Sequence, residues 1–145
     1  MCARHGKGRI TESFTITSGT VGVRPPPGLS NLAGGAAAVI HTARALALDL
    51  KPLRVNCIAP GLVDTEMWDV RCVSRNATYT VVLTQTHNQV MPAEMKQAFV
   101  QNTVSNQLIP HIGTPEEVGE AYLFAMKCSY LTGQVIVVDG GSTLV

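Results

Sequence analysis

Three of the four histidines are candidates for proton transfer near neutral pH: His41, His87 and His111. An imidazole titrates close to pH 6.5 and can act as a general acid or base. Each of the three also has a structural interpretation. His41 would sit on an exposed turn of a helix, His87 in a polar insertion, and His111 in a loop before a helix. Both interpretations stay open for each residue.

Four cysteines could bind a metal or form disulfides, but their spacing argues against both. They are Cys2, Cys57, Cys72 and Cys128, and no two of them form a Cys-x-x-Cys pair. Neither a zinc cage nor a disulfide framework is therefore predicted. Cys2 and His5 could supply half of a metal site, but no second pair completes it, so we interpret them as surface residues. We expect free thiols, with Cys57 in the core, and no metal site.

The composition excludes several classes of partner. The chain has 145 residues and a net charge of +1, and charged side chains make up 14% of it, against roughly 25% in an ordinary soluble domain. Without a block of Lys or Arg, neither nucleic acid nor an anionic membrane surface is an expected partner. The apolar stretch over residues 33–40 is far shorter than the roughly 18–20 residues of a spanning helix. Residues 1–9 lack the apolar segment of a secretory signal, so we expect a cytoplasmic protein.

The elements that would position these residues begin with a strand and a helix. Residues 14–17 are β-branched or aromatic and end at Ser18-Gly19, which predicts a strand followed by a turn. Three prolines at 25–27 predict a stiff connector, or alternatively a polyproline ligand. Residues 33–50 are strong helix formers with an apolar stripe through Val39, Ala43, Leu46 and Leu50. Pro52 is expected to end that helix.

Two more strands and a helix follow the same order. Residues 54–59 are apolar and precede Pro60-Gly61, which is typical of a strand buried in a parallel sheet. Thr114, Pro115 and Glu117 form the pattern of a capping box at a helix start. A third strand is predicted over residues 134–138. Alternating strands and helices predict an α/β layer structure with right-handed crossovers.

Several motifs, taken together, resemble the short-chain dehydrogenase/reductases, Rossmann-fold enzymes that move a hydride between NAD(P) and a carbonyl or alcohol. The motifs are Ile16-Thr17-Ser18-Gly19, residues 44–50, Arg54-Val55-Asn56 leading into residues 59–65, residues 113–118, and residues 131–141. The resemblance covers about residues 16–145. It implies a single partial domain over residues 1–145, the truncated C-terminal half of a doubly wound parallel sheet with about three strands and flanking helices.

The resemblance also shows which family features this sequence does not carry. The family's glycine-rich phosphate turn has no match, because Gly6-Lys7-Gly8 lacks the last glycine and precedes a strand. The residue that selects NAD or NADP would belong to the same missing half. The family's catalytic Tyr and Lys, four residues apart on a helix, correspond to Leu32 and Ala36. A shift of register by one residue changes nothing, since residues 24–50 contain no Tyr or Lys.

The residues that do match the family's site lie at strand ends. Ser18 matches the serine that hydrogen-bonds the substrate carbonyl, although a serine also commonly caps such a turn. Pro60, Gly61, Val63 and Thr65 match the segment that lines the nicotinamide, with the Val63 backbone at the carboxamide and the Thr65 hydroxyl near the amide or pyrophosphate. A Pro-Gly turn after a buried strand explains the same residues without a cofactor.

Residues 70–89 interrupt the family pattern. They mix Cys, Asn, Thr, Val and His with no helical stripe. We expect an insertion in the substrate loop or a disordered loop, since loops beyond about 12–15 residues are usually one or the other. An intron retained in the gene prediction is an alternative, and sequencing the transcript would test it.

Three classes of function stay open. The first is an NAD(P)-linked oxidoreductase of a small carbonyl or alcohol substrate, with redox activity of the chain alone not expected. The second is a non-redox isomerase, dehydratase or cyclase that reuses the family's pocket. The third is an inactive assembly module, because three strands from half a sheet leave one open edge, which favours a homo-oligomer or another partner there.

Overall fold

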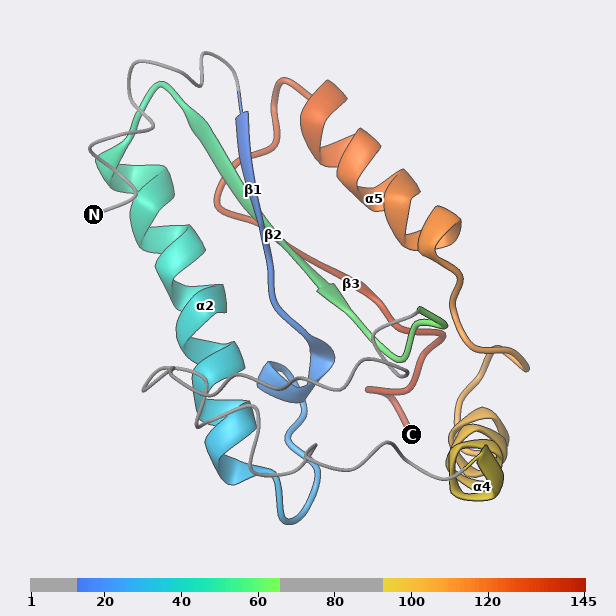
Figure 1. Ribbon diagram of the computed structural model, residues 1–145. Helices are drawn as coiled ribbons and strands as arrows, with labels where there is room; N and C mark the ends of the chain where they lie inside the picture. Colours follow the sequence, from blue (N-terminus) through green and yellow to red (C-terminus); the bar gives the residue numbers. More distant parts are fainter. Residues whose placement is uncertain (1–12, 66–92) are drawn as a thin grey trace, which may run out of the picture.

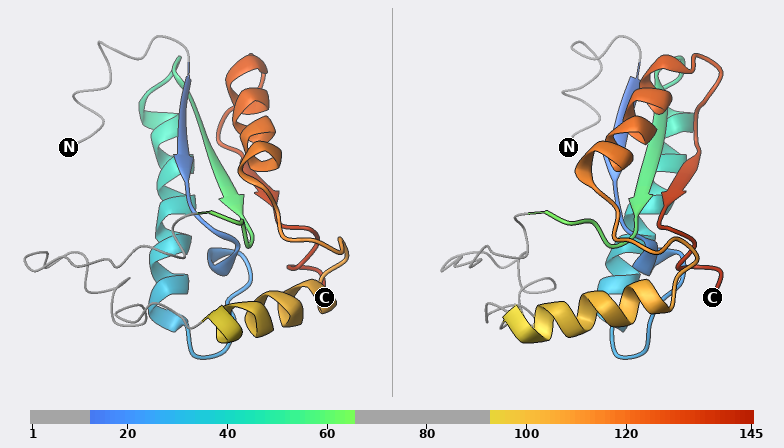
Figure 2. Two further views of the ribbon diagram at one scale, coloured as in Figure 1. Left: turned by 45° about the vertical axis from the view of Figure 1, so that its right-hand side comes forward. Right: turned by 90° about the vertical axis from the view of Figure 1, so that its right-hand side faces the viewer.

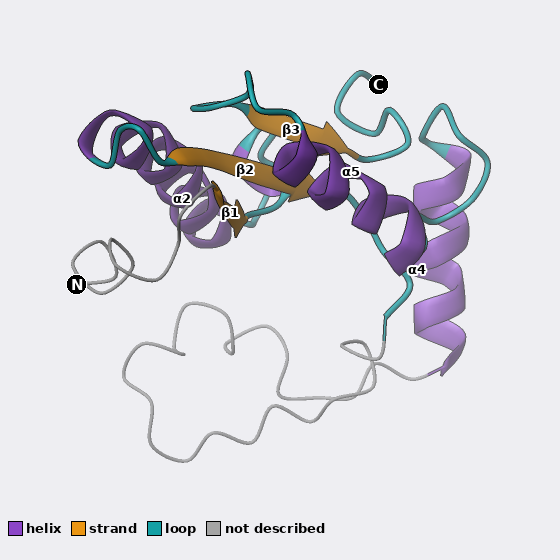
Figure 3. Ribbon diagram, turned by 90° about the horizontal axis from the view of Figure 1, so that it is seen from above, coloured by secondary structure: helices purple, strands orange, loops and turns teal. Residues whose placement is uncertain are grey.

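The described residues form a three-stranded parallel sheet covered on both faces. A computed structural model describes residues 13–65 and 93–145. The strands are β1 (Ser13–Thr17), β2 (Arg54–Pro60) and β3 (Val135–Val138), and they lie in the order β1-β2-β3. Helix α2 (Ser30–Asp49) covers one face and α5 (Pro115–Lys127) the other (Figures 1 and 3). The predicted α/β class and strand order along the chain are confirmed.

Two further helices lie near the carboxyl ends of the strands. The short 3-10 helix η1 (Thr20–Gly22) follows β1, and α4 (Ala93–Ser105) lies beyond the arrowheads of the strands (Figure 2). No helix among the described residues is long and apolar enough to cross a membrane.

Strand β2 forms the centre of the core. Its residues Val55 to Ala59, all apolar except Asn56, are fully buried, as expected for a central strand of a parallel sheet. Val55 and Cys57 pack with residues of α2, whereas Ile58 packs with residues of α5. Successive side chains of a strand point to opposite faces, so this one strand anchors both layers. The prediction that Cys57 is a core residue is confirmed.

Helix α2 begins earlier than predicted, and three of the four residues of the predicted stripe, Ala43, Leu46 and Leu50, lie in or against the core. It begins at Ser30, after the N-cap Leu29 and the preceding Gly28, whose positive φ of 82° suits a residue without a Cβ. The buried residues of the helix are Ala33, Ile40 and Ala43, and Leu50 follows them at its end. Ile40 therefore takes the core position that the sequence pattern gave to Val39, which is half-buried. Residues 33–38 are all Gly or Ala, so their hydrophobicity does not show which side of the helix faces the core.

The amino end of β2 is tied to the carboxyl end of α5. Arg54 donates through Nη1 to the carbonyls of Ala125 (2.8 Å), Cys128 (2.8 Å) and Leu131 (3.2 Å), and through Nη2 to that of Met126 (2.7 Å). The last carbonyls of a helix lack partners within it, and a cation there also opposes the helix dipole. One side chain thus satisfies the end of α5 and fixes it on the sheet.

The buried Asn56 also joins β2 to the loop that follows α5. Its Nδ2 donates to the Leu131 carbonyl at 3.0 Å, and its Oδ1 accepts from the Gln134 amide at 3.1 Å. Both groups of the amide are therefore paired in a fully buried position. The loop between α5 and β3 is held by β2 before β3 begins.

Several predictions lie outside the described residues. These are the insertion over 70–89, His87 within it, the pair Cys2 and His5, and the Gly6-Lys7-Gly8 turn.

We predict that Arg54→Met destabilises the fold by about 1–3 kcal/mol, because it leaves the carbonyls at the end of α5 without their charged donor. Urea denaturation followed by circular dichroism measures the change. Arg44→Met, at an exposed position of α2, is the matched control and should have little effect. Equal losses in the two variants would contradict the role given to Arg54.

Candidate functional site

The sequence-predicted site residues lie at the carboxyl ends of the parallel strands. Ser18 follows β1, residues 60–65 end and follow β2, and Asp139 follows β3. In open α/β sheets, ligands bind at this end of the strands. The structure thus brings together, on one side of the sheet, segments that the sequence separates by as many as 121 residues, from Ser18 to Asp139.

Gly61 has a packing role that needs no ligand. Its amide donates to the Val138 carbonyl at 2.8 Å. A Cβ on Gly61 would lie 2.8 Å from both Cα and Cβ of Asp139. The ends of β2 and β3 therefore meet too closely for any side chain at position 61.

The segment after β2 is held by a parallel bridge between Val63 and Gly113. Gly113 donates to the Leu62 carbonyl at 3.2 Å and accepts from the Asp64 amide at 2.9 Å. In this pattern the N–H and C=O of Val63 itself point away from Gly113. The bridge thus fixes the orientation of the Val63 backbone, which the family resemblance expects to face the nicotinamide carboxamide. Thr65, the last described residue of this segment, is half-buried.

Ser18 connects β1 to α2. Its amide donates to the Ile58 carbonyl at 2.8 Å, and its Oγ donates to the Ala36 carbonyl at 2.8 Å. The single hydroxyl proton is therefore used in a structural contact, as the turn-capping interpretation expects. The Oγ lone pairs are acceptors only, so a hydrogen bond from Ser18 to a substrate carbonyl would require this contact to break.

Ala36 is covered by the backbone of η1. A Cβ on Gly22 would lie 2.7 Å from the Ala36 carbonyl carbon and 2.9 Å from its Cβ. The contact with Ser18 places Ala36 beside the strand end, where the resemblance expects a Lys. Leu32 lies one turn earlier on α2 and is half-buried. Ala36 therefore lies beside Ser18, and neither Leu32 nor Ala36 has a side chain that can carry a proton.

Asp139 organises the residues after β3, a role that the sequence analysis did not identify. Its carboxylate accepts from the Gly141 amide (2.9 Å), the Ser142 hydroxyl (3.0 Å) and the Thr143 amide (2.8 Å). Burial alone would raise the pKa of Asp139, but these hydrogen bonds outweigh it and hold the pKa below its usual value. The Asp-Gly-Gly sequence could have predicted this turn, because glycine readily adopts the positive φ that Gly140 and Gly141 both have.

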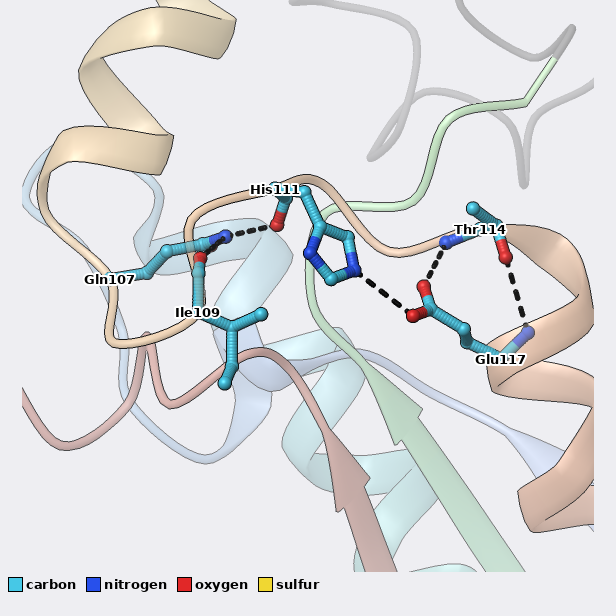
Figure 4. Close-up of polar contacts among 5 residues, drawn as sticks. All are labelled: Gln107, Ile109, His111, Thr114 and Glu117. Carbon is cyan, nitrogen blue, oxygen red and sulfur yellow. Dashed lines mark hydrogen bonds and ion pairs between the residues drawn. The ribbon is translucent and has the colours of Figure 1, made fainter.

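His111 pairs with Glu117 at the start of α5 (Figure 4). His111 Nε2 lies 2.9 Å from Glu117 Oε1, while Oε2 accepts from the Thr114 amide at 2.8 Å. Thr114 Oγ1 in turn accepts from the Glu117 amide at 3.3 Å, so the predicted capping box is confirmed. The hydrogen bonds from the Thr114 amide and from His111 lower the pKa of Glu117. Both side chains of the pair are about half exposed, at 52% and 48%.

A shallow groove of about 420 Å³ lies beyond the strand ends. It runs between the proline loop, α4 and the last residues of the chain, and its lining residues are Arg24, Pro25, Pro26, Pro27, Asn102, Thr103, Asn106, Ser142 and Val145. Arg24 Nη1 donates to the Ser142 carbonyl at 3.3 Å across one end. The connector with three prolines therefore forms one wall of a surface groove.

The described thiols and acidic groups do not form a metal site. Within residues 13–65 and 93–145, no three His, Cys, Asp or Glu side chains gather closely enough to hold an ion. Cys57 and Cys128 are free. Burial raises the pKa of the Cys57 thiol, more than a hydrogen bond from the Ser18 backbone lowers it.

Comparisons with known proteins agree on one family. The model of an SDR-like Rossmann domain, where SDR denotes short-chain dehydrogenase/reductase, matches residues 6–145. The chain is 34% identical over 133 residues to a short-chain dehydrogenase/reductase, ucsE, of Acremonium sp., covering 92% of this chain and 43% of that protein. It is 35% identical over 128 residues to the 3-oxoacyl-[acyl-carrier-protein] reductase of Chlamydia muridarum, covering 86% and 42%.

A solved structure gives the same result. The crystal structure of a small-chain dehydrogenase in complex with NADPH matches 99% of this chain and 57% of its own, with a TM-score of 0.81 and 33% identity. The chain thus spans a little under half of these curated relatives and somewhat over half of the solved one.

We predict that the stabilising effect of Glu117 disappears in acid. A carboxyl whose pKa is lower in the folded state stabilises the fold above its unfolded pKa, and this contribution is lost as the pH falls through the folded pKa. The urea midpoint of the unmodified chain should therefore exceed that of Glu117→Gln at pH 6, and the two should converge as the pH falls below the folded pKa of Glu117. Glu116→Gln, in the same helical turn, controls for the helix dipole. A difference between the Glu117→Gln variant and the unmodified chain that stays constant with pH would contradict the prediction.

Proposed function

We propose, since this chain belongs to the short-chain dehydrogenase/reductase family, that it forms the nicotinamide side of an NAD(P)-binding Rossmann domain. The observation that carries the proposal is the gathering of Ser18 and residues 60–65 at the carboxyl ends of adjacent parallel strands. A structural relative on which this chain superposes with a TM-score of 0.81 was solved with NADPH. NAD and NADP both remain in the proposal, because the residue that selects between them has no match here.

The described residues fit the nicotinamide end of the cofactor. The Val63 backbone points away from its bridge partner, and Thr65 follows it with a hydroxyl. Pro60 and Gly61 would shape the turn that presents both residues, with Gly61 held against Asp139. A bound reduced dinucleotide would supply a hydride. In this chain the Val63 backbone and the Thr65 hydroxyl would bind and orient the carboxamide of the nicotinamide.

The proton-transfer residues of the family do not fit. Leu32 and Ala36 stand where a phenol and an amine would be needed, and the hydroxyl proton of Ser18 is donated to the Ala36 carbonyl. Losing a positioned acid or base typically costs a factor of about 10² to 10⁴ in rate. We therefore propose that the chain binds the nicotinamide end weakly and does not reduce a carbonyl substrate by itself. A small carbonyl or alcohol substrate, a homo-oligomer and a cytoplasmic location stay predictions from the sequence.

The His111–Glu117 pair supports a second candidate function, a non-redox enzyme. A carboxylate 2.9 Å from one imidazole nitrogen fixes the orientation of the ring and leaves the other nitrogen as a possible base. Because both side chains are half exposed, a substrate could reach the ring. An isomerase or dehydratase would need such a base and no nicotinamide.

We expect NADPH at millimolar concentration to shift the amide NMR signals of residues 61–65 and to leave those of the carboxyl end of α5 unchanged. Thr65→Val, which removes a hydroxyl from a side chain of the same shape, should reduce the shifts at least about threefold. Thr42→Val, at an exposed position of α2, should not. Shifts that avoid residues 61–65, or none at all, would overturn the proposal.

For the second candidate, the measurable outcome is deuterium incorporation from D₂O into a 3-oxoacyl thioester without nicotinamide. The non-redox function predicts a rate above that of buffer that falls at least about tenfold in His111→Ala, whereas His41→Ala, on the exposed side of α2, keeps it. A rate equal to buffer excludes this reaction.

A further inference from the structure

The backbone around Val63 takes its position from one residue of a distant segment. The Gly113 amide donates to the Leu62 carbonyl at 3.2 Å, and the Asp64 amide donates to the Gly113 carbonyl at 2.9 Å. These two hydrogen bonds lie on either side of Val63 in the chain and form its bridge with Gly113. A movement of Gly113 would therefore carry the Val63 backbone with it.

The carboxylate of Glu117 binds the residues on both sides of Gly113 (Figure 4). Its Oε1 lies 2.9 Å from His111 Nε2, and its Oε2 accepts from the Thr114 amide at 2.8 Å. An ionised carboxylate only accepts hydrogen bonds, so Nε2 of His111 carries the proton in this contact. Glu117 itself belongs to α5, whose other end Arg54 fixes to β2. The carboxylate is thus a fixed point to which the chain around Gly113 is attached.

The connector before Gly113 is held at a second fixed point, the turn after β3. The amides of Leu108 and Ile109 both donate to the Gly140 carbonyl at 3.0 Å. Gln107 Nε2 donates to the carbonyls of Ile109, at 2.7 Å, and of His111 (Figure 4). His111 is therefore held through its carbonyl by the connector and through its ring by Glu117. The ring contact is the one that joins the connector to α5.

We propose that His111 and Glu117 are a positioning pair, which acts through Gly113 to hold the Val63 backbone in the orientation that the nicotinamide site needs. This inference rests on the proposed function, and neither side chain has to touch the cofactor. An ion pair in which both side chains are about half exposed contributes little to global stability. Its loss should therefore loosen residues 62–64 locally and leave the sheet folded.

Hydrogen exchange without any cofactor tests the positioning role directly. His111→Ala should speed exchange at the amides of Asp64 and Gly113 at least about threefold relative to the Gly61 amide, which is hydrogen-bonded to β3 at the same end of the sheet. His111→Gln keeps a donor for the carboxylate and should restore most of the protection. Glu116→Gln, in the same helical turn as Glu117, should change none of these rates.

Two results of the exchange experiment would overturn the inference. One is an unchanged rate at Asp64 and Gly113 in His111→Ala. The other is an equal increase at Gly61, because a merely structural contribution of the pair would raise all three rates together.

NADPH titrations of the same variants, followed by amide NMR signals, test the link to the cofactor. The shifts of residues 61–65 should require at least about threefold more NADPH in His111→Ala and a nearly unchanged concentration in His111→Gln. The Gln side chain has no ring nitrogen to serve as a base, so equal losses in both variants would assign the role to the imidazole itself and overturn the positioning pair.

The titration also separates this inference from the proposed function. Shifts of residues 61–65 that are the same in the unmodified chain and in His111→Ala would overturn the positioning pair and leave the proposed function standing. No shifts in the unmodified chain would overturn the proposed function, whereas the exchange rates would still decide whether the pair positions Val63.

Discussion

The guanidinium of Arg54 is the contact on which the arrangement of layers depends. It joins the start of the central strand to the four carbonyls at and after the end of α5, and the neighbouring Asn56 pairs with the loop that leads into β3. Both side chains lie where carbonyls would otherwise lack donors, so their loss leaves polar groups unsatisfied in a partly buried place. Because α5 is fixed at this end, its opposite end, with the capping box and His111, is brought to the carboxyl side of the sheet.

At that carboxyl side, packing explains most of the residues that resemble a cofactor site. Gly61 is small because Asp139 lies against it, Ser18 donates to α2, and the segment around Val63 is paired with Gly113. These contacts need no ligand. The role in joining strand ends therefore accounts for these residues independently of the nicotinamide site proposed for them.

Strand β1 is an edge strand of the described parallel sheet. Parallel sheets are normally buried on both faces and bounded by further strands, and an open edge exposes backbone donors and acceptors. Here the exposed edge and the half-buried Phe14 and Ile16 occur at the same strand. The open edge and the partial burial of these two side chains are therefore two results of one feature, the position of β1 at the end of the described sheet.

The sequence by itself determined the class of the fold, its three strands and the capping box, because these follow from local patterns: an apolar run in β2, Thr114 and Glu117 three residues apart, and Asp-Gly-Gly after β3. It also determined that residues 24–50 hold no Tyr or Lys. Only the tertiary structure decided that Ile40 rather than Val39 enters the core, since a run of Gly and Ala fits several rotations of α2. It also decided the contacts of Arg54 with α5, of Ser18 with Ala36 and of Gly61 with Asp139, because each joins residues 18 to 78 positions apart, and no local pattern encodes which distant atoms meet.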